Sequence, residues 1–199
     1  MDIQRKALIL NSCIRENSNT EALLGVFRDE FSRLTGSVPD EIRLAEADIG
    51  PCTACRYCQQ DWSKYTCSQR DDMDWISGRI LDAELLIAAS PIHFWYAAPP
   101  LMSAMDRLAY SMDMYYGGEK GPAFLKGKSL CAVTSCGYPI SKGSDLWEEG
   151  MKRAAKHMKM RWLGILAERH MGYDVPFMDK KKEEDARAFA HEIFQKWNA

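Results

Sequence analysis

The stretch that decides the fold runs from residue 7 to residue 36 and reads ALILNSCIRENSNTEALLGVFRDEFSRLTG. It opens with the apolar run Ala7–Leu10, which predicts a buried strand. The polar loop Asn11–Thr20 follows directly. Apolar residues then recur at helical spacing as far as Gly36, a residue suited to end a helix. Strand, loop and helix in this order are typical of an α/β protein with a parallel sheet.

The rest of the chain continues to alternate short apolar runs with helix-period segments. Four further strands are predicted at Glu41–Leu44, Leu85–Ala89, Leu130–Thr134 and Leu163–Ala167. Further helices are predicted to open at Asp71–Met73 and at Pro99, to span Leu146–Met160, and to carry the apolar face that runs from Ala186 to Trp197. Five strands and five helices predict a doubly wound α/β sheet, in which ligands bind beyond the carboxyl ends of the strands.

Length and composition set the limits of the interpretation. A chain of 199 residues suits one domain, here residues 1–199, with a cysteine-rich loop at about 50–70. A net charge of -2 gives no electrostatic case for nucleic acid, and no apolar run approaches the roughly 20 residues that cross a bilayer. The first residues lack the long apolar segment of a signal peptide, so we expect a cytoplasmic protein.

The loop after the first strand has the chemistry of an anion site. The start of a helix offers free backbone N–H groups and a partial positive charge, which suit a phosphate. Ser12, Ser18, Asn19 and Thr20 add short hydrogen-bonding side chains, and Arg15 adds a positive charge. The alternative is helix capping without a ligand, because Ser18–Glu21 also fits the capping-box pattern. The two compete, since a glutamate and a phosphate would share the same N–H donors.

Two further loops follow strands three and four. The turn Pro91–Tyr96 is unusually aromatic, as expected where a flat, apolar ring is bound, although an exposed interface patch or a local core plug would read the same way. In the loop after strand four, Ser135–Pro139, backbone N–H groups can stabilise negative charge, or the segment is an ordinary turn.

Four of the seven cysteines form a run, Cys52-x2-Cys55-x2-Cys58-x8-Cys67. Thiolates are the ligands of iron–sulfur clusters, and a CxxCxxC segment places three of them on one loop. Zinc bound by four thiolates and a set of free thiols remain open alternatives. Cys131 lies in a predicted strand and is expected to pack in the core.

Four segments resemble one known family when they are taken in order. They are Ser12–Leu24, the cysteine run followed by Asp71–Met73, Ala89–Trp95 and Met105–Leu108. In this order and spacing they resemble the NAD(P)H-dependent FMN reductase family and the related iron–sulfur flavoproteins, over residues 6 to about 165. Asn11 departs from the pattern, because the family usually has Gly there.

The resemblance implies a flavodoxin-like fold with strand order 2-1-3-4-5 and FMN as the cofactor. It places the FMN phosphate and ring on Ser12, Arg15, Ser18, Asn19, Thr20, Pro91, Ile92, His93, Phe94, Trp95, Ser135, Cys136, Gly137 and Tyr138. It also places a possible [4Fe–4S] cluster on Cys52, Cys55, Cys58 and Cys67. No protein acid or base is required, because the flavin itself carries the hydride chemistry.

Three functions follow as hypotheses. The first is an oxidoreductase that takes a hydride from NADH or NADPH and reduces a quinone, a flavin or another small acceptor. The second is an electron carrier with FMN and a [4Fe–4S] cluster that serves a ferredoxin-like protein. The third is a flavodoxin-like interaction module without a cofactor. By the resemblance we expect a homodimer, with the cysteine loop and Tyr115–Gly118 as candidate contacts.

Overall fold

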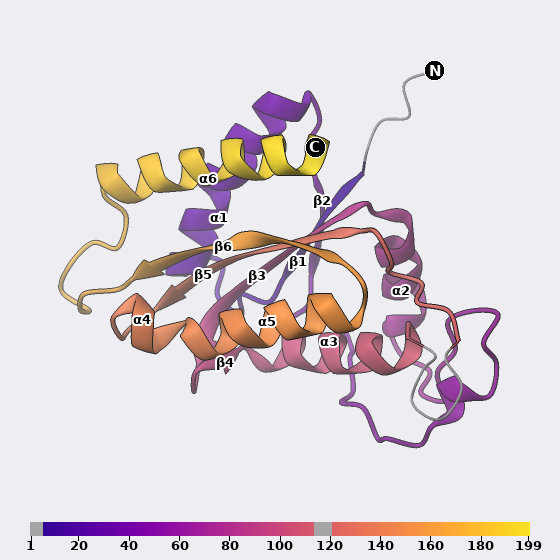
Figure 1. Ribbon diagram of the computed structural model, residues 1–199. Helices are drawn as coiled ribbons and strands as arrows, with labels where there is room; N and C mark the ends of the chain where they lie inside the picture. Colours follow the sequence, from indigo (N-terminus) through magenta and orange to yellow (C-terminus); the bar gives the residue numbers. More distant parts are fainter. Residues whose placement is uncertain (1–5, 114–120) are drawn as a thin grey trace.

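The computed structural model of the protein describes residues 6–113 and 121–199. Five parallel strands form its sheet in the order β2-β1-β3-β5-β6 (Figure 1). They are β1 (Ala7–Asn11), β2 (Asp40–Arg43), β3 (Leu85–His93), β5 (Ser129–Cys136) and β6 (Arg161–Arg169). The predicted doubly wound sheet and its order are therefore confirmed, with β5 and β6 as the predicted fourth and fifth strands.

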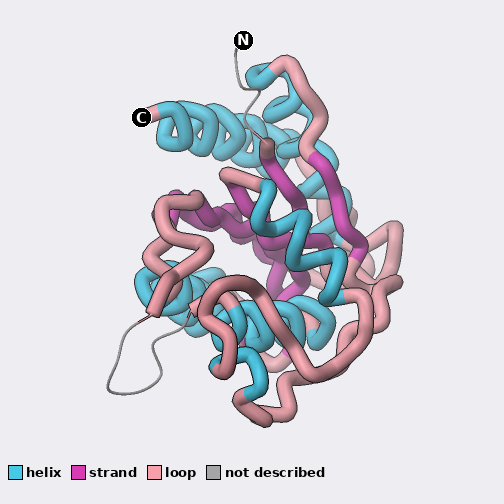
Figure 2. The backbone as a smooth tube through the Cα atoms, turned by 90° about the vertical axis from the view of Figure 1, so that its right-hand side faces the viewer, coloured by secondary structure: helices cyan, strands magenta, loops and turns pink. Residues whose placement is uncertain are grey.

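Helices cover both faces of this sheet (Figure 2). On one face lie α1 (Asn19–Thr35) and α6 (Lys180–Asn198). On the other lie α2 (Met73–Asp82), α3 (Pro99–Ser111) and α5 (Asp145–His157). Two short helices are also present, the 3-10 helix η1 (Tyr57–Gln59) and the four-residue helix α4 (Ile140–Gly143).

Strand periodicity explains why the central strands are apolar throughout. Successive side chains of a strand point to opposite faces. In β3, Leu86 and Ala88 therefore join the core against α2, α3 and α5, while Leu85 and Ile87 join the core against α1 and α6. Both faces are covered, so the first six positions of β3 are buried and the sequence shows an unbroken apolar run there.

Several boundaries differ from the predicted ones. The predicted turn Pro91–Tyr96 is largely strand, because β3 continues to His93 and then pairs antiparallel with a short sixth strand, β4 (Tyr96–Ala97). Likewise, β5 extends through Ser135 and Cys136, which pair with β6. The helix predicted to reach Met160 ends at His157, since Lys159 takes a left-handed conformation (φ 54°) before β6.

The helix ends follow the expected chemistry. Gly36 ends α1 in the left-handed region with φ 73°, as predicted. Helix α6 begins at Lys180, earlier than its apolar face suggests, because the Asp179 carboxylate accepts a hydrogen bond from the Lys182 N–H. In the part of the chain that the structure describes, every helix is too short or too polar to span a bilayer. Tyr115–Gly118, a predicted dimer contact, lies outside the described residues.

Candidate functional site

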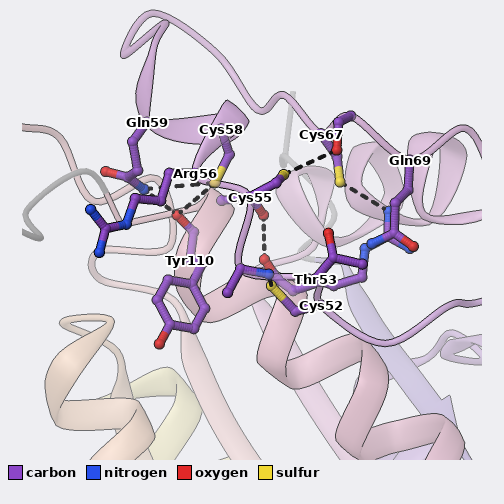
Figure 3. Close-up of a pocket in the computed structure, with 13 residues that line it drawn as sticks. Cys52, Thr53, Cys55, Arg56, Cys58, Gln59, Cys67, Gln69 and Tyr110 are labelled. Carbon is purple, nitrogen blue, oxygen red and sulfur yellow. Dashed lines mark hydrogen bonds between the residues drawn. The ribbon is translucent and has the colours of Figure 1, made fainter.

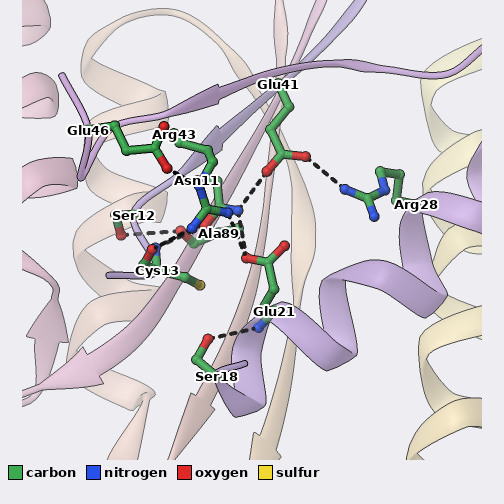
Figure 4. Close-up of polar contacts among 10 residues, drawn as sticks. All are labelled: Asn11, Ser12, Cys13, Ser18, Glu21, Arg28, Glu41, Arg43, Glu46 and Ala89. Atoms are coloured by element: carbon green, nitrogen blue, oxygen red, sulfur yellow. Dashed lines mark hydrogen bonds and ion pairs between the residues drawn. The ribbon is translucent and has the colours of Figure 1, made fainter. Parts of the chain in front are cut away.

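The loop after β1 ends in a helix cap that is only half of a capping box. The Ser18 hydroxyl accepts a hydrogen bond from the Glu21 N–H at 3.2 Å and caps α1. The Glu21 carboxylate does not fold back onto the start of the helix. It accepts a hydrogen bond from Asn11 Nδ2 at 2.8 Å and lies 3.5 Å from Arg43 (Figure 4). The Glu21 carboxylate therefore does not occupy the N–H donors for which it would compete with a phosphate.

This arrangement leaves hydrogen-bond donors available at the start of α1. Within residues 6–113 and 121–199, the backbone N–H groups of Ser18, Asn19 and Thr20 donate to no protein acceptor. These groups lie at the positive end of the helix dipole. They fit a phosphate better than they fit a self-contained cap.

The other predicted side chains of this loop differ in how free they are. Arg15 is exposed, whereas Ser12 is buried and its hydroxyl donates to the Ala89 carbonyl of β3 at 3.2 Å. Ser12 therefore anchors the loop to the sheet. Cys13 is also buried, and burial raises the pKa of its thiol to about 11. It is a packing residue at pH 7 rather than a thiolate.

Thr20 joins the first loop to the end of β5. Its hydroxyl and that of Ser135 lie 2.7 Å apart and are both buried. The two residues are far apart in the sequence, so the sequence analysis named both of them but could not predict that they pair. The hydrogen bond fixes the distance between the loop after β1 and the end of β5. The hydroxyl that accepts in this pair keeps its O–H free to donate to a ligand.

The turn between β3 and β4 is strained and exposed. Phe94 and Trp95 both have positive φ, 50° and 68°, as the tight type I′ hairpin turn requires. Such conformations disfavour residues with side chains, and they gather at functional sites. Phe94 is 86% exposed, whereas His93 pairs with Tyr96 in the short ladder. The turn thus presents an aromatic surface at the carboxyl edge of the sheet.

A second contact joins this turn to the loop after β5. The rings of Trp95 and Tyr138 stack with centroids 5.6 Å apart, and Trp95 Nε1 donates to the Lys142 carbonyl at 2.9 Å. Cys136 is buried and its Sγ donates to the Tyr138 carbonyl at 3.3 Å. Gly137 is exposed between them. The three predicted loops therefore meet at one edge of the sheet.

The four clustered cysteines line one cavity of about 500 Å³ (Figure 3). Cys55 Sγ lies 3.1 Å from the Ser68 hydroxyl, and this hydrogen bond lowers the pKa of the exposed Cys55 thiol. Burial instead raises the pKa of Cys58. Among the described residues, no three Cys, His, Asp or Glu side chains are grouped tightly enough to hold a metal ion. The sulfurs share a cavity without forming a ready coordination shell.

A buried ion pair fastens the cysteine segment to the domain. Arg107 of α3 is 2% exposed and pairs with Asp71, just before α2. It also donates to the Gly50 carbonyl at 3.4 Å and to Cys67 Sγ at 3.3 Å. Burial alone would raise the pKa of Asp71, but the Arg107 guanidinium and the N–H groups of Gly50 and Met73 together lower it. Sequence reasoning placed Arg107 in a family motif but missed this role.

The two candidate sites lie at different ends of α3. The aromatic turn precedes Pro99, the first residue of α3, while the cavity uses Arg107, Tyr110 and Ser111 in its last turns. At 1.5 Å per residue, Pro99 and Tyr110 are roughly 16 Å apart along the helix axis. Figure 1 shows the cysteine segment and the β4 turn on opposite sides of the lower layer.

The fold, with three loops joined at the carboxyl edge of a doubly wound sheet, defines the chain as a flavodoxin-like α/β protein. Residues 5–167 match the model of the family described as NADPH-dependent FMN reductase, and the chain belongs to this family. The predicted family is confirmed, and with it FMN as the cofactor that the family name specifies.

Archaeal iron–sulfur flavoproteins are similar in sequence over part of the chain. One from Archaeoglobus fulgidus is 25% identical over 103 residues, which are 52% of this chain and 45% of that protein. One from Methanosarcina thermophila is 29% identical over 94 residues, 47% of each. The matches thus span about half the length of these curated relatives.

Solved structures share the fold at low sequence identity. RosB with bound 8-demethyl-8-formylriboflavin-5′-phosphate superposes with a TM-score of 0.68 at 16% identity, covering 98% of this chain and 79% of that chain. An FMN-dependent NADH-azoreductase from Bacillus anthracis in complex with FMN gives 0.67 at 12% identity, covering 96% and 98%. At such identities these likenesses show the fold alone.

Proposed function

We propose that this chain is an FMN-dependent NAD(P)H oxidoreductase that reduces a small acceptor such as a quinone or a flavin. The observation that carries the proposal is the joining of three predicted flavin loops at the carboxyl edge of the sheet. Thr20 bonds to Ser135 at 2.7 Å, and Trp95 stacks on Tyr138 at 5.6 Å. Family membership supports the cofactor and the donor.

In this proposal each loop takes one part of FMN. The N–H groups of Ser18, Asn19 and Thr20 hold the phosphate, with Ser12 as the anchor of the loop and Arg15 as an exposed positive charge. Pro91, Ile92, His93, Phe94 and Trp95 border the ring and the ribityl chain, and Ser135, Cys136, Gly137 and Tyr138 border its pyrimidine edge.

The chemistry divides between cofactor and protein. When bound, FMN supplies the ring that accepts a hydride and passes electrons on. The chain binds and orients that ring, and N–H groups at the end of β5 favour negative charge at its edge. Phe94 and Tyr138 are 86% and 59% exposed, so the aromatic surface of this edge is open to a nicotinamide or an acceptor.

The visible spectrum of anaerobically purified protein tests the proposal. We expect the two absorption bands of bound flavin, and bleaching of them when NADPH is added under argon. The same titration with NADH identifies the donor. A colourless preparation that does not take up added FMN contradicts the proposal and supports a module without a cofactor. A yellow protein that neither nicotinamide bleaches contradicts the reductase activity alone.

A second candidate function is an iron–sulfur flavoprotein that carries electrons. The observation that favours it is the shared cavity of Cys52, Cys55, Cys58 and Cys67, together with the Arg107 hydrogen bond to Cys67. Four thiolates are a suitable donor set for a [4Fe–4S] cluster, and a hydrogen bond to a sulfur tunes such a cluster. The sulfurs would have to draw closer to bind it, as they would for zinc.

Metal and sulfide analysis separates the alternatives for these cysteines. A cluster gives about four irons and four sulfides per chain and a broad brown absorption that Cys55→Ser removes. Zinc at about one per chain indicates a structural site. Protein free of both, with all four thiols titratable, supports free thiols. Cys131→Ser is the control for these measurements, because Cys131 lies in the core away from the cavity.

The proposed assembly and location follow from the family rather than from a contact in the structure. We propose a homodimer in the cytoplasm, with a ferredoxin-like partner only in the second candidate function. Light scattering of the purified protein measures the mass directly. A chain mass of 22.7 kDa makes a dimer about twice that value, and a monomeric mass at all concentrations contradicts the dimer.

A further inference from the structure

The side chain of Asn11 lies between two carboxylates at the end of β1. It is fully buried, and its Nδ2 donates to Glu21 at 2.8 Å and to Glu41 at 2.7 Å. Its Oδ1 accepts a hydrogen bond from the Cys13 N–H at 2.9 Å. Both donors and the acceptor of this amide are therefore engaged, so its orientation is fixed by the contacts around it.

Two arginines balance the carboxylates of this cluster (Figure 4). Arg28 pairs with Glu41 at 2.8 Å. Arg43 lies 3.5 Å from Glu21, pairs with Glu46 at 2.7 Å and donates to the Cys13 carbonyl at 3.4 Å. The Glu21 carboxylate thus has both a hydrogen-bond donor and a positive charge on the side of the sheet, away from the start of α1.

Glu21 stands at the third residue of α1, where a capping-box glutamate would stand. In a capping box its carboxylate would accept from the N–H of the cap residue, here Ser18. It would then occupy a donor that a phosphate needs, and it would repel the phosphate charge. The contacts with Asn11 and Arg43 keep it from that position.

We propose that Asn11 is a positioning residue that keeps the Glu21 carboxylate off the start of α1, so that this helix end stays open to the phosphate of the flavin. The inference rests on the proposed FMN function and deepens it. It makes the affinity for the phosphorylated cofactor depend on an amide that does not touch the ligand.

Comparing FMN with riboflavin, which lacks the phosphate, tests the inference. Flavin-free protein is titrated with each flavin, and binding is followed by flavin fluorescence. Asn11→Ala frees Glu21, so we expect FMN affinity to fall about tenfold while riboflavin affinity changes less than about twofold. In Asn11→Ala/Glu21→Ala both the capping side chain and its charge are gone, and FMN affinity should return to within about twofold of wild type.

Glu41→Gln is the matched control. It removes the other carboxylate held by Asn11 but releases nothing toward α1, so both affinities should stay within about twofold of wild type. Thermal melts of every variant confirm that the chain is folded.

The outcomes distinguish the inference from the function on which it rests. Equal losses of FMN and riboflavin affinity in Asn11→Ala, or no recovery on adding Glu21→Ala, would mean that Asn11 only shapes the loop, and the inference fails. Wild-type protein that binds neither flavin overturns the proposed function itself. Wild-type protein that binds both flavins equally well shows that the phosphate does not sit at α1.

Discussion

The carboxyl edge of the sheet and the cysteine segment are built in different ways. The residues at the edge lie on or beside the ends of regular elements. They contact each other in two pairs, Thr20 with Ser135 and Trp95 with Tyr138. The cysteine segment runs from the end of β2 to the start of α2 with one short 3-10 turn, η1. Its main buried polar anchor among the described residues is the pair Arg107–Asp71.

The difference shows where each site obtains its rigidity. Strand ends are fixed by the sheet ladder, so residues placed on them keep their positions without a ligand. A long irregular segment has no such ladder, and segments of this length in compact domains are usually functional. We infer that the carboxyl edge of the sheet is preformed, whereas the cysteine cavity depends mainly on the Arg107–Asp71 pair.

The largest expected effect comes from removing that anchor. Arg107→Ala leaves Asp71 buried without its partner, which costs about 3–5 kcal/mol in the free energy of unfolding. Urea unfolding followed by circular dichroism measures this. Arg153→Ala is the control, since its pair with Glu149 is exposed and its loss should not be measurable. Similar stabilities of the two variants would show that the pair is not an anchor.

A smaller effect is expected from breaking the Thr20–Ser135 hydrogen bond at the carboxyl edge of the sheet. Thr20→Val leaves the buried Ser135 hydroxyl without its partner and should lower the free energy of unfolding by about 1–3 kcal/mol. Adding Ser135→Ala removes the unpaired group, so the double variant should be more stable than Thr20→Val alone. Additive losses in this double-mutant cycle would contradict a direct bond.

At the strained turn between β3 and β4, we expect a substitution that raises the free energy of unfolding instead of lowering it. Phe94→Gly relieves a left-handed residue and should raise the free energy of unfolding by up to about 1 kcal/mol. It should also weaken flavin binding, because the aromatic surface is lost. Phe94→Ala is the matched variant, as it removes the ring but keeps the strain. Weaker binding in both variants with added stability in Phe94→Gly alone is the expected pattern; unchanged affinity in both would remove Phe94 from the site.

The last prediction concerns the reactivity of the thiols and involves no substitution. The pKa of the exposed Cys55 is lowered, whereas burial raises the pKa values of Cys13 and Cys131. Under native conditions iodoacetamide should therefore modify Cys55 well before the two buried thiols, with a rate that levels off at lower pH than for a free peptide thiol. Peptide mass spectrometry gives the order. Early modification of Cys13 would show that the loop after β1 opens easily.

Much of the fold was predictable because it depends on neighbours in the sequence. The strand at Leu85–Ala89, the helix that ends at Gly36 and the helix start at Pro99 were predicted correctly from local pattern. The continuation of β3 to His93 was missed, because a turn-like proline at position 91 hid a strand whose pairing with β4 and β5 is non-local.

The candidate site was predictable only in part. Each loop carried a recognisable chemistry, yet capping and phosphate binding at Ser18 could not be separated from the loop alone. The deciding contact joins Glu21 to Asn11, and Asn11 also reaches Glu41 on the neighbouring strand. Whether the N–H groups at the start of α1 face the Glu21 carboxylate or stay open to a phosphate therefore depends on residues of the neighbouring strands.

The alternation of strands and helices, the three loops at one edge of the sheet and the spacing of the cysteines all follow from the sequence. These features depend on periodicity and on neighbouring residues. Only the tertiary structure decided that Thr20 bonds to Ser135, that Trp95 stacks on Tyr138 and that Arg107 reaches Cys67. The physical reason is that such contacts join residues far apart in the chain, and the packing of the sheet and helices alone brings them within reach.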